Sequence, residues 1–176
     1  MGKRVKNITD VKIIKTKLHL DNRGYFFESF SEKKKYNSLN VNFLQDNISL
    51  SKKNVIRGLH YQHKPQSQLL TLVYGKIFDV IVDLRKNSKN YKNWIGINLD
   101  HTKNNQIYMP PGVAHGFCVL SDFAILHYKV TKIYDKNNEA GIKWNDNILN
   151  VKWPIKKPII SKKDNLLPKF SKILNL

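Results

Sequence analysis

The chain has 176 residues, of which 41% are hydrophobic, and carries a formal net charge of +18 at pH 7. This length supplies one substantial core and is short for two domains, and no apolar run reaches the roughly 18 residues that span a bilayer. We therefore expect one domain over residues 1–176, with no membrane partner. The N-terminus lacks the apolar core of a signal peptide, and the single Cys118 has no partner for an intrachain disulfide. Both features favour a cytoplasmic location.

The positive charge would attract polyanions, so nucleic acid and nucleotides both deserve consideration as partners. Most of the charge comes from lysines spread along the chain, such as Lys33, Lys34 and Lys35. No basic stretch alternates with aromatic residues, which favours a solubilising surface over a nucleic-acid groove. Arginine occurs only four times. In such a lysine-rich chain, an arginine suggests a need for two-pronged hydrogen bonding to phosphate or carboxylate.

The first twenty residues alternate loosely between apolar and basic types and predict one or two short strands. Asp21-Asn22-Arg23-Gly24 is typical of a turn, and the aromatic run 25–27 and Glu28 follow it. This stretch is either a hairpin with a core aromatic or a charged pair around aromatics that grips a base and its sugar. Residues 31–39 predict a helix with Ser31 as its N-cap.

Short apolar segments separated by turns follow, and they predict strands over residues 43–50, 55–62, 68–73, 76–84, 94–99, 106–109, 117–120 and 124–131. Eight strands within about ninety residues, with no helix-length spacers, favour an all-β antiparallel sandwich or barrel over a parallel fold. The tail over about residues 144–176 contains Pro154, Pro158 and Pro168 and is expected to wrap around this core.

The segment Arg57-Gly58-Leu59-His60-Tyr61-Gln62 places a cation and an imidazole close together on a predicted strand. Alternation puts His60 on one face with Gly58 and Gln62, and Leu59 with Tyr61 on the other. This histidine is either functional or a buried histidine bonded to the backbone.

Three further patterns gather residue types that suit a sugar pocket. Gln45 and Asn47 share a strand face, and their amides suit sugar hydroxyls. A Pro-Pro-Gly turn delivers His115 to the start of a strand, and alternation puts Tyr128 and Tyr134 on one face.

Metal and nucleophile chemistry are not expected. His60 and His63 point to opposite faces of a strand, and no carboxylate follows at a spacing that would complete a ligand set. Cys118 lies in an apolar run without charged neighbours, and no serine sits in a Gly-x-Ser-x-Gly elbow.

Several motifs in order resemble the dTDP-4-dehydrorhamnose 3,5-epimerase family. They are the segments 57–62, 78–85, 110–117, 144–146 and 153–154, within a match that runs from about Asp21 to Asp164. The resemblance implies a cupin-type β jelly roll with a few short helices, a homodimer, and no metal or organic cofactor. It also implies C3 and C5 epimerisation of a nucleotide-linked 4-keto-6-deoxy sugar, in the synthesis of surface polysaccharides such as capsule or lipopolysaccharide.

The resemblance also implies roles for individual residues. A hydrogen beside a ketone can be removed when the enolate is stabilised, so the site needs a base, an acid on the opposite face, and donors to the oxygen. His60 matches the family's base, Asp164 the carboxylate that orients it, and Tyr134 the acid. The positions that match substrate contacts are Arg23, Phe26, Glu28, Gln45, Asn47, Arg57, Gln68, His115 and Lys163.

Gln68 departs from the family, which commonly has a lysine at this position. A neutral amide donates a weaker hydrogen bond than an ammonium group does. Two alternatives therefore stay open: a C3-only epimerase acting on another nucleotide 4-keto sugar, such as a GDP-linked hexose or heptose, and a non-catalytic cupin that binds sugar nucleotides. The sequence leaves the nucleotide itself undecided between dTDP, GDP and others.

Overall fold

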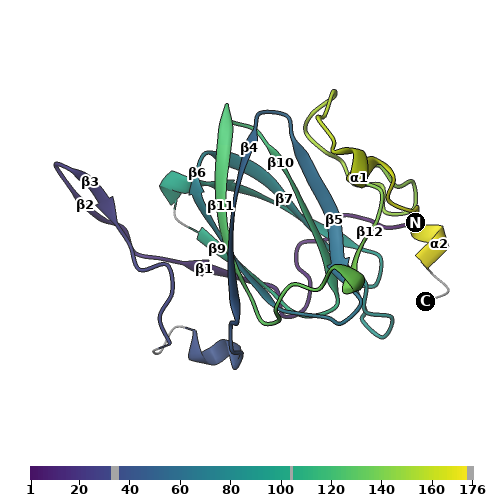
Figure 1. Ribbon diagram of the computed structural model, residues 1–176, viewed down its shortest axis with the longest axis horizontal. Coiled ribbons are helices and arrows are strands. Elements are labelled where there is room, and N and C mark those ends of the chain that lie inside the picture. The colour runs from purple at the N-terminus through teal and green to yellow at the C-terminus, as the bar shows by residue number, and fades with distance from the viewer. Residues whose placement is uncertain (33–35, 104, 174–176) are drawn as a thin grey trace.

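The computed structural model describes residues 1–32, 36–103 and 105–173, and two five-stranded antiparallel sheets face each other in it (Figure 1). The first, called the β11 sheet, has the order β1 (Lys12–Lys15), β9 (Asn105–Met109), β6 (Gln68–Tyr74), β11 (Phe123–Val130), β4 (Gln45–Lys52). The second, called the β5 sheet, has the order β12 (Glu139–Gly141), β5 (Ile56–Gln62), β10 (Val113–Val119), β7 (Lys76–Asp83), β8 (Trp94–Asp100). The predicted all-β antiparallel fold is confirmed.

The remaining elements are short. Strands β2 (His19–Asp21) and β3 (Gly24–Phe26) form a hairpin that projects from the body at the end opposite the C-terminal helices (Figure 1). The helical turns are η1 (Asn37–Leu39), η2 (His101–Lys103), η3 (Lys136–Asn138), α1 (Lys162–Asn165) and α2 (Phe170–Ile173). None of the helices in the described part of the chain is long or apolar enough to cross a bilayer.

The eight strands predicted between residues 43 and 131 correspond to β4 through β11, with shifted ends. The largest shift is in β10, which begins at Val113 and not at Phe117. Val113 already pairs with Asp83, because β7 extends far enough to continue the ladder to that point. His115 therefore lies inside a strand that is hydrogen-bonded on both sides.

The helix predicted over residues 31–39 is wrong for the described part of that segment. Residues 33–35 lie outside the described residues, and only Asn37–Leu39 form a 3₁₀ turn. Tyr36 and Leu39 are buried in a cluster with Leu69 of β6 and Tyr108 of β9. Packing on the outer face of the β11 sheet thus decides the local backbone, which is how tertiary contacts commonly override helix propensity.

Two hydrophobic clusters hold the β5 sheet from its two sides. One lies between the sheets and includes Ile81, Phe117 and Leu126. The other lies on the outer face, where Trp144, Trp153 and further side chains of the C-terminal segment pack against Leu59, Val80 and their neighbours. The C-terminal segment therefore covers one face of the β5 sheet and brings α1 beside β5 (Figure 1).

Strand β5 contains a bulge that sets the direction of its side chains. His60 pairs with His115 and Arg57 pairs with Phe117, so three steps on β5 face two steps on β10. Gly58 lies at this irregularity with a φ of 113°, and a Cβ there would approach the Gly116 Cα and the His115 carbonyl oxygen to 2.7 Å. Only glycine suits that combination of a left-handed backbone and a close backbone neighbour.

Candidate active site

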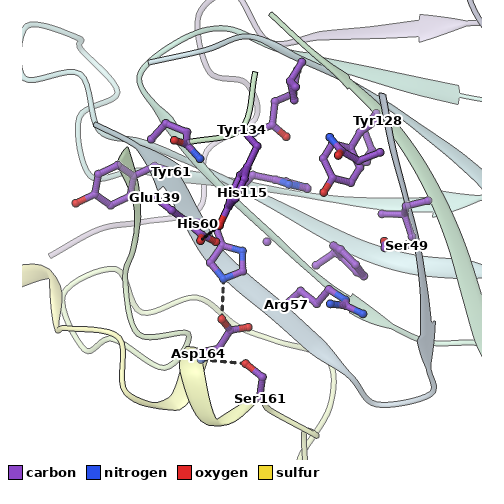
Figure 2. A pocket seen from close by; sticks show the side chains of 18 of the residues that line it. Ser49, Arg57, His60, Tyr61, His115, Tyr128, Tyr134, Glu139, Ser161 and Asp164 are labelled. Carbon is purple, nitrogen blue, oxygen red and sulfur yellow. Dashed lines mark hydrogen bonds and ion pairs between the residues drawn. The ribbon is translucent and has the colours of Figure 1, made fainter. Parts of the chain in front are cut away.

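A cavity of about 740 Å³ opens between the two sheets and is lined from both of them (Figure 2). Its volume lies in the range of pockets that bind small molecules. The β5 sheet contributes Arg57, His60 and His115, while the β11 sheet contributes Gln45 and Tyr128 among others. Titratable groups from one wall thus face amides and aromatic rings from the other.

His60 lines this cavity and is bound to a buried carboxylate (Figure 2). Its Nε2 lies 2.7 Å from the Asp164 Oδ1. Asp164 is only 4% exposed. Burial raises the pKa of the Asp164 carboxyl, but the hydrogen bonds from His60 and from the Gly58 N–H outweigh it, so the pKa is lowered overall. Asp164 therefore stays ionised and can fix the orientation of the imidazole and balance a charge on it.

A single helical turn positions Asp164. Ser161 caps α1, and its hydroxyl oxygen accepts a hydrogen bond from the Asp164 N–H. The cap turns the chain so that Asp164 is buried while Lys162 is left exposed.

His115 forms a second histidine–carboxylate pair on the same wall. Its Nε2 lies 2.7 Å from the Oδ2 of Asp79, a residue of β7 that is fully buried. The other oxygen, Oδ1, has no hydrogen-bond partner among the described residues. This pairing holds the His115 ring at the cavity wall, with its remaining nitrogen free to bind a ligand.

The bulge brings Arg57 into the same cavity as His60. Strict alternation would put the two side chains on opposite faces of β5, because they are three residues apart. The Arg57 Nε donates to the Ser51 Oγ at 2.8 Å, and its Nη2 donates to the Leu50 carbonyl at 3.2 Å. These bonds to β4 hold the guanidinium group across the space between the two sheets.

The cavity wall formed by the β11 sheet has regular strand alternation. Gln45 and Asn47 both line the cavity, as their spacing predicts, and the Gln45 Nε2 donates to the Asn47 Oδ1 at 2.7 Å. Gln68 lines the cavity from the first position of β6. Tyr128 lies across the cavity from the His60–Asp164 pair (Figure 2), and burial raises the pKa of its hydroxyl.

Tyr134 lies at the cavity rim in a charged cluster. Its hydroxyl donates to the Glu139 Oε2 at 2.9 Å, and this hydrogen bond raises the pKa of Tyr134. Lys163 forms an ion pair with the same oxygen. The cluster joins the segment after β11, strand β12 and helix α1. Tyr134 is 55% exposed, so its ring remains available to a ligand at the rim.

Three predicted contact residues lie outside the cavity of this chain. Arg23 is at the tip of the β2–β3 hairpin, where it donates to the Asp21 carboxylate at 2.6 Å. Phe26 is 70% exposed on the same hairpin, and Glu28 follows it as an exposed residue. None of the three lines the cavity.

Among the described residues, no three His, Cys, Asp or Glu side chains gather in a group that could hold a metal ion. Both cavity histidines are instead engaged by single carboxylates.

The family model described as dTDP-4-dehydrorhamnose 3,5-epimerase matches residues 5–172 of this chain. The chain belongs to this family. The resemblance seen in the sequence motifs is thereby confirmed, and as a member of an epimerase family the chain is an isomerase.

Individual members of the epimerase family are similar along nearly the whole chain. The dTDP-4-dehydrorhamnose 3,5-epimerase of Shigella flexneri is 46% identical over 161 residues, which cover 89% of each chain. The crystal structure of the Bacillus anthracis enzyme with TDP and PPi bound has a TM-score of 0.88 and 42% identity, covering 94% of this chain and 97% of that one. The Legionella pneumophila enzyme in complex with dTDP-4-keto-L-rhamnose has a TM-score of 0.85 and 38% identity, covering 95% and 96%.

The epimerase-family motifs located most of the cavity but missed three of its features. Tyr128 was paired with Tyr134 by alternation, yet only the structure shows that it is the more enclosed of the two. Asp79 lies within the matching segment 78–85, which gave no sign that it would bind His115. Glu139 had no sequence signal, because its two partners come from the segment after β11 and from α1.

Proposed function

We propose that this chain epimerises a dTDP-linked 4-keto-6-deoxy sugar at C3 and C5, by removing a proton beside the ketone and returning one from the opposite face. The observation that carries the proposal is His60, hydrogen-bonded to Asp164 on one cavity wall and facing Tyr128 on the other, in a chain of the epimerase family. A base and an acid on opposite sides of a bound sugar are what inversion at carbon requires.

His60 is the base in this proposal. Its Nε2 is held by Asp164, which leaves Nδ1 to take the proton from the sugar. The imidazolium that forms lies against an ionised carboxylate and is stabilised by it, as in other histidine–carboxylate pairs. Because Asp164 is nearly fully buried, little water competes for this interaction.

The negative charge that develops on the ketone oxygen needs donors in the cavity. Arg57, His115 and the amide of Gln68 line the cavity and can supply them. Arg57 brings a fixed positive charge to the β5 wall. Gln68 contributes a neutral donor where the family commonly has a lysine, which weakens one such interaction.

Two tyrosines are candidates for the acid. Tyr134 is the residue that the family resemblance implied, but its hydroxyl is committed to Glu139 at the rim. Tyr128 comes from the β11 sheet, so its hydroxyl approaches a bound sugar from the side opposite His60 (Figure 2). Its position favours Tyr128 as the donor and leaves Tyr134 to contact the nucleotide part of the substrate.

The chain is proposed to act as a homodimer in which the β2–β3 hairpin of one subunit completes the cavity of the other. The hairpin projects from the body (Figure 1), so Arg23, Phe26 and Glu28 are placed for a partner's substrate and not for their own. The outer face of the β11 sheet also exposes apolar residues, with Ile48 at 74% and Leu50 at 57%. Apolar surface on an edge strand suits burial against a second copy.

Mixing two inactive variants tests this arrangement. The His60→Ala variant has a defective cavity and an intact hairpin. The variant that combines Arg23→Ala with Glu28→Ala has an intact cavity and a defective hairpin. If hairpins serve the partner, equal mixing after reversible dissociation restores one intact site in each mixed dimer, or about a quarter of wild-type activity. If each hairpin serves its own cavity, or the protein is a monomer, mixing restores nothing.

The reaction itself is tested by incubating the chain with dTDP-4-keto-6-deoxyglucose in deuterated water and following the sugar by NMR. Deuterium at both C3 and C5 with inverted products is expected. Exchange at C3 alone would indicate the C3-only epimerase that neutral Gln68 leaves open, and a panel of other nucleotide 4-keto sugars would then identify the substrate. Binding without exchange would indicate a non-catalytic cupin. A cytoplasmic location, which the free and buried Cys118 favours, remains a prediction.

A further inference from the structure

A lysine lies on the inward-facing stripe that continues strand β11. Alternate residues from this strand and the segment after it line the cavity, namely Leu126, Tyr128, Val130, Lys132 and Tyr134. The outward residues between them include Lys129, which is bound to Asp46 on the far face of the sheet. Lys132 thus places a charged side chain on a stripe whose other members are apolar or aromatic.

The backbone on both sides of Lys132 is fixed. The Thr131 N–H donates to the Ser67 carbonyl at 3.2 Å, and the Thr131 Oγ1 accepts from the Ser67 N–H at 2.9 Å. The Tyr134 N–H donates to the Gln45 Oε1 at 2.7 Å. These hydrogen bonds connect the segment to β6 and β4. The backbone that holds Lys132 at the cavity mouth is therefore hydrogen-bonded on both sides and is not a free loop.

Apart from Arg57, which binds Ser51 and the Leu50 carbonyl, the other basic side chains of the cavity are held by carboxylates. Lys163 is paired with Glu139, and His60 and His115 are each held by a carboxylate. Lys132 forms no hydrogen bond or ion pair with any described residue, and it is exposed at the rim. It is therefore a positive charge in the cavity that a ligand can use without displacing a protein carboxylate.

The position of Lys132 indicates which part of a ligand it meets. The sugar must lie near His60, and the nucleoside must extend from it towards solvent, so the diphosphate that links the two passes the cavity mouth. On this wall, Val130 pairs with Gln68, whose side chain is neutral. We propose that Lys132 binds the diphosphate of the nucleotide sugar and supplies the positive charge of the β11 wall. This inference rests on the proposed function for the class of ligand.

Calorimetric titration with dTDP, at low and at high salt, tests the role of Lys132. Lys132→Gln is expected to weaken dTDP binding about fivefold at low salt, as for one partly exposed ion pair, and to make binding less dependent on salt. Lys129→Gln is the matched control, because this lysine lies three residues away on the same segment and faces the opposite side. It should bind dTDP as the wild type does.

Two results would overturn the inference. One is dTDP affinity of Lys132→Gln within about twofold of wild type. The other is an equal loss in Lys129→Gln, which would mean that overall charge and not position attracts the nucleotide. The test separates this inference from the proposed function, since it measures binding alone. A chain that binds dTDP through Lys132 but gives no deuterium exchange would retain the inference and lose the epimerase proposal.

Discussion

The two walls of the cavity are built by different rules. The β11 wall is regular: Gln45 and Asn47 on β4, and Tyr128 and Val130 on β11, alternate as the strand period dictates. The β5 wall is irregular, since the bulge at Gly58 puts Arg57 and His60 on one face although they are three residues apart. The comparison shows that the regular wall shapes the cavity, whereas the irregular wall concentrates charged groups that alternation would separate.

The walls differ in chemistry as well. The β5 wall carries both histidine–carboxylate pairs and Arg57, whose partners come from β4, β7 and α1. On the β11 wall, the Gln45 amide donates to the Asn47 side chain and accepts from the Tyr134 backbone N–H at the rim. Proton removal is thus assigned to the β5 wall and proton return to the β11 wall, and substitutions on each wall test this division.

Loss of the base should have the largest effect. His60→Ala removes the group that accepts the proton, and deuterium exchange at the sugar carbons should fall about 10⁴-fold. NMR of the sugar in deuterated water measures it, and dTDP binding with an unchanged unfolding transition serves as the control. Exchange at the wild-type rate in a folded His60→Ala protein would remove the β5 wall from the chemistry.

The acid on the opposite wall comes next. Tyr128→Phe should slow epimerisation about 10²–10³-fold but slow hydrogen exchange much less, because His60 can remove and return a proton on its own side. Tyr134→Phe is the matched change, and it should mainly raise the Michaelis constant. The opposite pattern, with the split between exchange and epimerisation in Tyr134→Phe, would return the acid to the rim, where the family resemblance implied it.

Replacing Gly58 tests whether the bulge holds the β5 wall in its irregular shape. Gly58→Ala forces a Cβ against the backbone of β10 at a positive φ, so the free energy of unfolding should fall by about 2–3 kcal/mol. His60 and Arg57 should also lose their common direction, with a loss of turnover beyond that of stability. Urea denaturation measures the first and steady-state kinetics the second. Ser49→Ala, on the regular wall, should change stability little, and an equally stable Gly58→Ala protein would contradict this view of the bulge.

The smallest expected effect concerns the neutral donor on the regular wall. Gln68→Lys places an ammonium group near the developing enolate and should raise turnover about tenfold if the ketone oxygen lies within its reach. If the substrate has its own hydroxyl there, turnover should instead fall by crowding. Kinetics that stay unchanged on every substrate tested would show that Gln68 has no part in the reaction.

The sequence alone determined the fold class, the positions of most strands and the family. Alternation over short apolar segments depends only on neighbouring residues, so it predicted that Gln45 and Asn47 share a face, and the family motifs named His60 and Asp164 together. These features are local or are carried by motifs that recur in order along the chain.

Tertiary structure alone decided how the walls meet. The bulge at Gly58 depends on the pairing of β5 with β10, which the sequence of β5 does not specify. The hydrogen bond between Asp79 and His115 and the ion pair between Glu139 and Lys163 join residues far apart in the chain. Whether Tyr128 or Tyr134 is enclosed depends on where β11 ends against β6 and β4. In each case, contacts between segments distant in sequence fix the direction of a side chain. Local sequence propensity does not predict such contacts.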